Sequence, residues 1–131
     1  MSHTFYVDAS VPIHVAQSLG VVRDDILYPG AIGCPVPSPN VDDRAWLKVA
    51  GEEDWVVLMR DKKIRSRRWE RQALTEAGVR AFCLTAAGNY SEWKTLQLLA
   101  KRWDDIEEIA TSTPGPYIYS VTQAGVRFLA A

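Results

Sequence analysis

Short apolar runs alternate along the chain with segments whose apolar residues recur at helical spacing. Four runs have the length and composition of buried strands: 5–7, 55–59, 79–84 and 117–121. Four segments carry the helical pattern: 10–19, 42–50, 66–77 and 89–109. Because strands and helices alternate, the pattern predicts an α/β fold with a mainly parallel sheet between two layers of helices.

Local signals mark the ends of the predicted helices. Ser10 is placed to cap the first helix, which we expect to stop at Gly20, and Val21 and Val22 then begin a further short strand. Asp42 is placed to cap the second helix. Ser66 and Gly78 are expected to flank the third. Between 28 and 40, four prolines and two glycines predict a long loop.

The last helix has the clearest pattern. Asn89 and Glu92 have the spacing of a capping box at its start. Its apolar residues are expected to face the core in one stripe: Trp93, Leu96, Ala100, Trp103, Ile106 and Ile109.

Length and composition indicate a single globular domain over residues 1–131. Cys34 and Cys83 stand far apart, which excludes a CxxC zinc site and favours two free thiols in a reducing compartment. No apolar run is long enough to span a membrane, and residues 1–8 lack the features of a signal peptide. We therefore expect a cytoplasmic protein.

Positive charge is concentrated in the sequence just after the apolar run 55–59. The net charge is −1, yet seven of the 15 Lys and Arg residues fall between positions 60 and 71. A local basic patch can bind phosphates although the whole chain is nearly neutral. The candidates for binding nucleic acid are Lys62, Lys63, Arg65, Arg67, Arg68 and Arg71.

Three aspartates are expected at one edge of the sheet. Asp8 ends the first strand, and Asp61 lies just past the apolar run 55–59. Asp43 opens the helix that leads into that run. Carboxylates held this close repel one another, and a divalent cation removes that penalty. Oxygen ligands suit Mg²⁺ or Mn²⁺, which can activate a water beside a phosphodiester. This pattern predicts a metal-dependent phosphodiesterase.

Each of these features also has an ordinary structural explanation. A single aspartate is commonly a helix cap or turn residue, and Asp42 or Asp43 could serve as one. Asp61 could simply pair with its basic neighbours, and the basic run could be a solvated helix entrance. His14 is expected to be a surface or packing residue, and the tryptophans are expected mainly in the core.

The chain resembles the PIN-like nucleases, in particular the VapC-like branch of bacterial toxins. The resemblance begins at FYVDAS and is closest over DRAWLKVAGEEDWVVLMRDKKIR, and it continues through AGVRAFCLT to PGPYIYSV. In it, Asp8, Asp43 and Asp61 occupy the positions of the three catalytic, metal-binding acids. It implies a three-layer α/β/α PIN-like domain and a Mg²⁺- or Mn²⁺-dependent endoribonuclease. It also implies an antitoxin protein as partner, and a homodimer.

Two departures from the family pattern bear on the site. Many relatives carry Thr or Ser just before the third acid, where this chain has Met59 and Arg60. Some add an acid two positions after it, where this chain has Lys63. These departures favour a site that holds one metal firmly, with Asp42 as a further ligand.

Two alternative enzyme classes fit less well. A haloacid-dehalogenase-type phosphatase needs a second Asp at the position of Ser10, and a receiver domain needs paired acids at the first strand. The stronger alternative is a PIN-like module that binds RNA or protein without cleavage.

Overall fold

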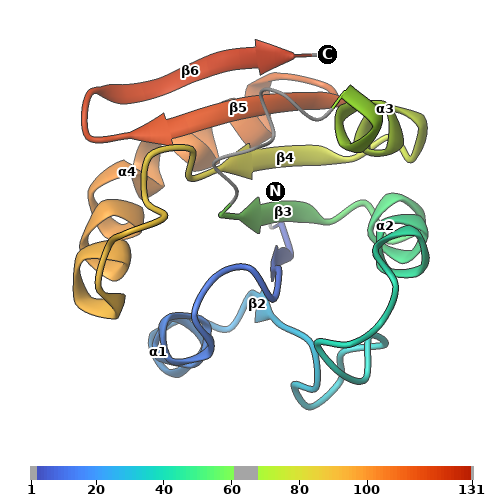
Figure 1. The fold of residues 1–131 in the computed structure, drawn as a ribbon, viewed down its shortest axis with the longest axis horizontal. Coiled ribbons are helices and arrows are strands. Elements are labelled where there is room, and N and C mark those ends of the chain that lie inside the picture. Colours follow the sequence, from blue (N-terminus) through green and yellow to red (C-terminus); the bar gives the residue numbers. More distant parts are fainter. Residues whose placement is uncertain (1–2, 61–67, 131) are drawn as a thin grey trace.

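A computed structural model describes residues 3–60 and 68–130 of the chain, and for Asp43 and residues 68–70 only the backbone. The described residues form one six-stranded sheet in the order β2-β1-β3-β4-β5-β6. Neighbouring strands are parallel except β5 and β6, whose arrows point in opposite directions in Figure 1. The strands are β1 Phe5–Val7, β2 Ile26–Leu27, β3 Val56–Met59, β4 Arg80–Cys83, β5 Tyr117–Thr122 and β6 Gly125–Ala130.

Helices cover both faces of the sheet. In the described part of the chain they are α1 Ile13–Val22, α2 Asp43–Glu52, α3 Arg68–Glu76 and α4 Glu92–Ser112. Successive strand residues point to opposite faces, so Phe5 and Val7 pack with α1 and α4, whereas Tyr6 packs with α2. The predicted three-layer α/β/α fold with a mainly parallel sheet is confirmed.

The central strands are buried on both faces, as their sequences predict. All four residues of β3 and of β4 are buried. This pattern is typical of parallel strands that are covered by helices on both sides. The loop predicted over 28–40 is also confirmed, since no helix or strand occurs between β2 and α2.

The start and end of α1 differ from the prediction. The N-cap residue is Pro12, and the Ser10 hydroxyl is used elsewhere. At the other end, the helix continues through Gly20 to Val22, and the second strand forms only at Ile26–Leu27. A glycine inside a helix costs only about 1 kcal/mol, which the packing of Leu19 in the core outweighs.

The C-terminal third of the chain shows two further differences. The N-cap of α4 is Ser91, whose hydroxyl accepts a hydrogen bond from Lys94 N–H, so the capping box at Asn89 and Glu92 is wrong. The buried stripe of α4 is centred on Leu98, Leu99, Trp103 and Ile106, and Trp93 is 67% exposed. The hairpin strand β6 was not predicted, because its GVRFLA sequence shows no regular alternation.

Within the described ranges, no helix is both long enough and apolar enough to cross a bilayer.

Helices α2 and α3 meet at Gly51. A Cβ atom built on Gly51 would lie 2.0 Å from the carbonyl oxygen of Ala77, which is too close for any side chain. We therefore expect Gly51→Ala to lower the free energy of unfolding by about 1–3 kcal/mol, because the two helices would have to move apart. Chemical denaturation would measure this change.

Gly20→Ala provides the matched control. A Cβ at Gly20 would meet its nearest atom at 3.8 Å, an ordinary contact, and the residue lies inside α1. This variant should gain about 0.5–1 kcal/mol from helix propensity. Equal effects of the two substitutions would show that the Gly51 contact does not constrain the helices.

Candidate active site

The carboxyl ends of β1, β3, β4 and β5 lie at one edge of the sheet, because these strands are parallel. Val7 is in register with Leu58, and Asp8 N–H donates to the Leu58 carbonyl oxygen at 2.9 Å. Asp8 and Arg60 therefore follow directly from two paired strands. In open α/β sheets, functional sites form at this edge.

The Asp8 carboxylate is held by Ser10. It is partly buried, and its Oδ2 atom accepts hydrogen bonds from Ser10 Oγ at 2.6 Å and from Ser10 N–H at 3.2 Å. Two donors on one oxygen fix the orientation of the carboxylate, and the short hydroxyl bond has the length of a charge-assisted hydrogen bond.

Ser10 also binds the end of the neighbouring strand. Arg60 N–H donates to Ser10 Oγ at 2.9 Å, and Arg60 Nε–H donates to the Ser10 carbonyl oxygen at 3.1 Å. One hydroxyl therefore connects Asp8 to the residue that precedes Asp61. The sequence suggested Ser10 as a helix cap, but its hydroxyl instead connects the ends of the paired strands β1 and β3.

Helix α2 begins at the same edge of the sheet. It runs back from Asp43 to feed β3, and its Trp46 ring packs on Tyr6 of β1 with 5.3 Å between ring centroids. Asp42 is the N-cap residue, as predicted, but its exposed side chain makes no capping hydrogen bond. The Asp42 carboxylate is therefore not used for capping the helix.

Much of the predicted site lies outside the described residues. This applies to Asp61, Lys62, Lys63, Arg65 and Arg67, and to the side chains of Asp43 and Arg68. Arg71 is partly buried on α3, where its carbonyl oxygen accepts a hydrogen bond from the Thr75 hydroxyl. The backbone thus brings the positions of Asp8, Arg60 and Asp43 to one edge, and the convergence of the three carboxylates stays a prediction.

The chemistry of the candidate ligands suits a hard divalent cation, because all of them are carboxylates. Among the described side chains, no group of three or more His, Cys, Asp or Glu residues could hold a metal ion. Asp8, which Ser10 orients, is the one described carboxylate at the ends of β1 and β3. A metal centre here therefore requires Asp43 and Asp61 to complete the ligand set.

A pair of hydroxyls extends this edge towards β5. Thr85, just after β4, and the buried Ser120 of β5 share a hydrogen bond of 2.5 Å between their oxygens. Sequence reasoning missed Ser120, because a serine inside an apolar strand carries no signal of its own.

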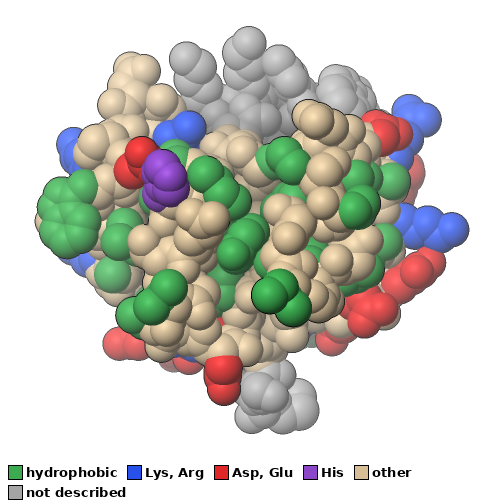
Figure 2. Space-filling model, turned by 90° about the horizontal axis from the view of Figure 1, so that it is seen from below, with side chains coloured by type: hydrophobic (Ala, Val, Ile, Leu, Met, Phe, Trp, Pro, Cys, Tyr) green, Lys and Arg blue, Asp and Glu red, His purple; other side chains and the backbone are tan. Residues whose placement is uncertain are grey.

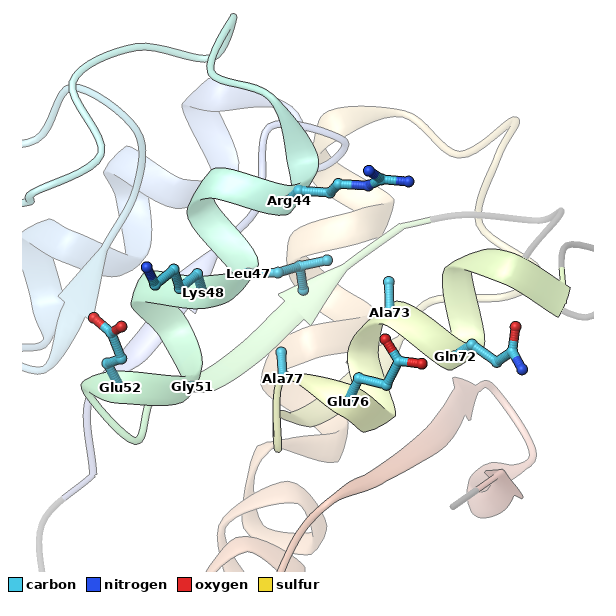
Figure 3. A pocket seen from close by; sticks show the side chains of 9 residues that line it. All are labelled: Arg44, Leu47, Lys48, Gly51, Glu52, Gln72, Ala73, Glu76 and Ala77. Atoms are coloured by element: carbon cyan, nitrogen blue, oxygen red, sulfur yellow. The ribbon is translucent and has the colours of Figure 1, made fainter.

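A groove of about 860 Å³ lies between α2 and α3. Figure 3 shows Arg44 and Leu47 pointing from α2 towards α3, with Glu76 on the wall formed by α3. Small residues, Gly51, Ala73 and Ala77, also line it. Its charged lining consists of two cations, Arg44 and Lys48, and two carboxylates, Glu52 and Glu76. They are not part of any group of three or more metal-ligating side chains among the described residues, so the groove is not the candidate site.

A second pocket, of about 630 Å³, lies at the opposite, amino-terminal edge of the strands. Its buried Arg80 donates to the carbonyl oxygens of Ala110 and Asp54, tying the end of α4 to the loop before β3. Burial and the charge of Arg80 lower the pKa of the neighbouring His3. These contacts indicate a structural role.

The cysteines and His14 are placed as the sequence predicts. Cys34 and Cys83 are not joined by a disulfide, and burial raises the pKa of the Cys34 thiol, which disfavours a reactive thiolate. His14 is on the surface of α1, where its Nδ1 atom lies 2.8 Å from Glu92 Oε2. None of the three adds a nucleophile or a base to the candidate site.

The fold and the acid at the end of β1 define an α/β/α domain with a candidate hydrolytic edge. A family model described as a PIN like domain matches residues 3–86, well over half of the chain. The protein belongs to the PIN-like domain family, whose members are commonly nucleases. The match does not select a branch within that family. Searches of curated proteins and of solved structures gave no match.

We expect Ser10→Ala to destabilise the protein by about 1–3 kcal/mol, because the Arg60 N–H would lose its acceptor and Asp8 would lose its shortest hydrogen bond. Ser10→Thr keeps the hydroxyl and should be close to wild type. Ser18→Ala is the control, since that exposed hydroxyl bonds only within α1. Denaturation curves in which Ser10→Ala matches Ser18→Ala would contradict the bridging role.

Proposed function

We propose that this protein is a divalent-metal-dependent endoribonuclease that hydrolyses phosphodiester bonds. One observation carries the proposal. In a chain of the PIN-like family, Ser10 joins Asp8 to Arg60, so the first acid is fixed beside the residue that precedes Asp61. A strand-end carboxylate that is oriented in this way is suited to a hydrolytic site.

The three aspartates have distinct origins and a common proposed role. Asp8, Asp43 and Asp61 would hold Mg²⁺ or Mn²⁺, with Asp42 as a further ligand, since its carboxylate makes no cap. When bound, such an ion supplies an activated water and neutralises charge that develops on the phosphate. Ser10 keeps Asp8 in one rotamer, so binding needs little reorganisation of that carboxylate.

The basic residues after β3 have the proposed role of binding the RNA backbone. Arginine can bind a phosphate through two parallel hydrogen bonds, and lysine acts as a point charge. Such contacts position RNA without reading its bases. The residues proposed for this role are Lys62, Lys63, Arg65, Arg67, Arg68 and Arg71.

A narrower proposal follows from the resemblance to the VapC-like branch. It makes the chain the toxin of a type II toxin–antitoxin pair, with a short antitoxin protein as partner and a homodimer as the assembly. The tests are a short open reading frame directly upstream and inhibition of the RNase by its product. An unaffected RNase would remove this part of the proposal and leave the nuclease intact.

A second candidate function is a binding module that does not cleave. The observation in its favour is that the sequence departs from the pattern of many relatives, with Met59 and Arg60 before the third acid and Lys63 after it. Such a module would retain RNA binding through the basic residues and show no metal-dependent hydrolysis.

We expect Asp8→Asn and Asp61→Asn each to lower RNA cleavage in Mn²⁺ by about 100-fold or more, because even the outer partners of metal ligands typically contribute 10–100-fold. RNA binding should persist in both variants. Asp104→Asn is the control, because Asp104 is an exposed acid of α4 and is not one of the proposed metal ligands. Gel assays of a labelled RNA would report cleavage, and wild-type rates in both site variants would refute the proposed centre.

RNA affinity should depend on salt through the basic residues. For single strands, each phosphate contact contributes about 0.7 to the slope of log K against log salt concentration. We expect Arg65→Ala combined with Arg68→Ala to flatten that slope by about 1.4. Lys101→Ala combined with Arg127→Ala removes the same charge from exposed sites on α4 and β6. An equal loss of slope in both pairs would mean that only net charge matters.

A further inference from the structure

Two hydroxyl groups meet at the carboxyl edge of the sheet, on the far side of β3 from Asp8. Ser120 lies inside the apolar strand β5 and is 5% exposed, whereas Thr85 is partly buried just after β4. Their oxygens are 2.5 Å apart, and this is the one hydrogen bond of either hydroxyl within the described part of the chain. A buried hydroxyl costs free energy unless it is hydrogen-bonded, so Ser120 depends on Thr85.

The pair retains one proton that the bond between the two oxygens does not use. Each hydroxyl carries one proton, and a single proton lies in the shared hydrogen bond. Because Ser120 is buried, we assign its proton to that bond, so the more exposed Thr85 hydroxyl keeps its own proton for an outside acceptor. Accepting a hydrogen bond from Ser120 also polarises the Thr85 hydroxyl and makes it a stronger donor.

The hydroxyl pair and Asp8 belong to the same face of the sheet. Asp8 N–H and Leu84 N–H continue the pairing of β1 and β4 with β3, so the alternation of side chains extends to the ends of these strands. The residues two positions before Asp8, Thr85 and Ser120 all lie in the core on the α2 side: Tyr6, Cys83 and Ile118. Asp8 and the hydroxyl pair are therefore placed on the α2 side as well.

Thr85 is far enough from Asp8 to bind a different phosphate. Strands β1 and β4 flank β3, so two strand spacings, about 10 Å, separate their backbones. On the other side of Asp8 lies β2, and Figure 2 views the molecule from that side. Among its coloured side chains, Lys and Arg lie near the rim, and the centre carries separate hydrophobic groups. A polyanion that extends from Asp8 is therefore better served towards β4 and β5.

We propose that Thr85 binds the RNA phosphate next to the one that is cleaved, and that Ser120 positions the Thr85 hydroxyl for this contact. The proposal rests on the proposed ribonuclease function and adds a second phosphate subsite to it. A hydroxyl that donates to an anionic oxygen forms a charge-assisted hydrogen bond. Phosphate contacts fix the register of a nucleic acid without reading its bases, so this subsite would set which bond lies at Asp8.

The same pair of hydroxyls also has a purely structural explanation. One hydrogen bond could simply connect the turn after β4 to β5. Removing either hydroxyl would then have the same effect, because both changes break the same bond. In the proposal the two changes differ: loss of the Thr85 hydroxyl removes the phosphate contact, whereas loss of the Ser120 hydroxyl removes only its orientation.

The test uses the full chain carrying Thr85→Val, which keeps the shape of the side chain without the hydroxyl. Cleavage of a 12-nucleotide RNA in Mn²⁺ gives kcat and KM, and binding is measured with Asp8→Asn also present. We expect Thr85→Val to weaken binding and to raise KM by about tenfold, the effect of one hydrogen bond to a charged group. The value of kcat should change little, because ground state and transition state share this contact. Thr85→Ser should resemble wild type, and Ser120→Ala should be intermediate.

Thr75→Val is the matched control, because Thr75 is partly buried and its hydroxyl donates to the Arg71 carbonyl oxygen within α3. It should leave KM and affinity unchanged. Thr85→Ala is a second variant without the hydroxyl and should behave like Thr85→Val. Denaturation curves of all variants verify that each protein is folded.

RNAs that each carry one uncharged methylphosphonate linkage identify the phosphate directly. With Asp8→Asn alone, neutralising the phosphate next to the cleaved bond should weaken binding. With Thr85→Val added, the same change should cost much less affinity, because its partner on the protein is already missing. Wild-type KM and affinity in Thr85→Val, equal losses in Thr85→Val and Ser120→Ala, or losses that do not depend on the position of the linkage would each overturn the subsite.

These outcomes separate the subsite from the nuclease. A protein that never cleaves RNA, but whose affinity depends on Thr85 and one phosphate, would overturn the ribonuclease and keep the phosphate contact. Metal-dependent cleavage with unchanged KM in Thr85→Val would keep the ribonuclease and overturn the subsite. Absence of both binding and cleavage would overturn both.

Discussion

The parallel pairing of β1 with β3 is the constraint on which the candidate site depends. These strands are adjacent at the centre of the sheet, and Asp8 N–H continues the ladder by donating to Leu58. Beyond the last backbone hydrogen bond of this pair, the Ser10 hydroxyl connects the two strand ends, because it donates to Asp8 and accepts from Arg60 N–H. The two strand ends therefore cannot separate without leaving a polar group unsatisfied. This is how a three-residue strand holds an acid in a fixed place.

The helical layers make that pairing stable. Alternate residues of β1 enter two different cores: Tyr6 stacks on Trp55 and packs on Trp46, whereas Phe5 contacts Trp103 of α4. In the helical layer formed by α2 and α3, Gly51 lies against the backbone of Ala77, so the carboxyl ends of the two helices are in direct contact. The amino-terminal end of α2, which starts at Asp43, is thereby kept at the functional edge.

The functional edge divides into parts with different proposed tasks. In the proposed function, Asp8 and its partners would act on the phosphodiester, and the basic residues after β3 would bind the RNA backbone. Both sets of residues follow the carboxyl ends of the paired strands β1 and β3 in the sequence, which is why residues far apart in the chain are proposed to act on one polymer. A net charge of −1 is compatible with the proposed RNA binding, because seven of the 15 Lys and Arg residues fall between positions 60 and 71 of the sequence.

Local periodicity and turn chemistry were enough to predict the fold class, the buried strands β3 and β4, the long loop and the position of Asp8 at a strand end. Residues near one another in the chain carry such signals. The tertiary structure was needed to find the role of Ser10, since its partner Arg60 is 50 residues away. It also decided that Trp93 faces solvent: the helical spacing fitted Trp93 into a core stripe, but the sheet buries Leu98 and Leu99 of the same helix instead. Which face of a helix is covered depends on where the strands lie, and periodicity alone does not give that.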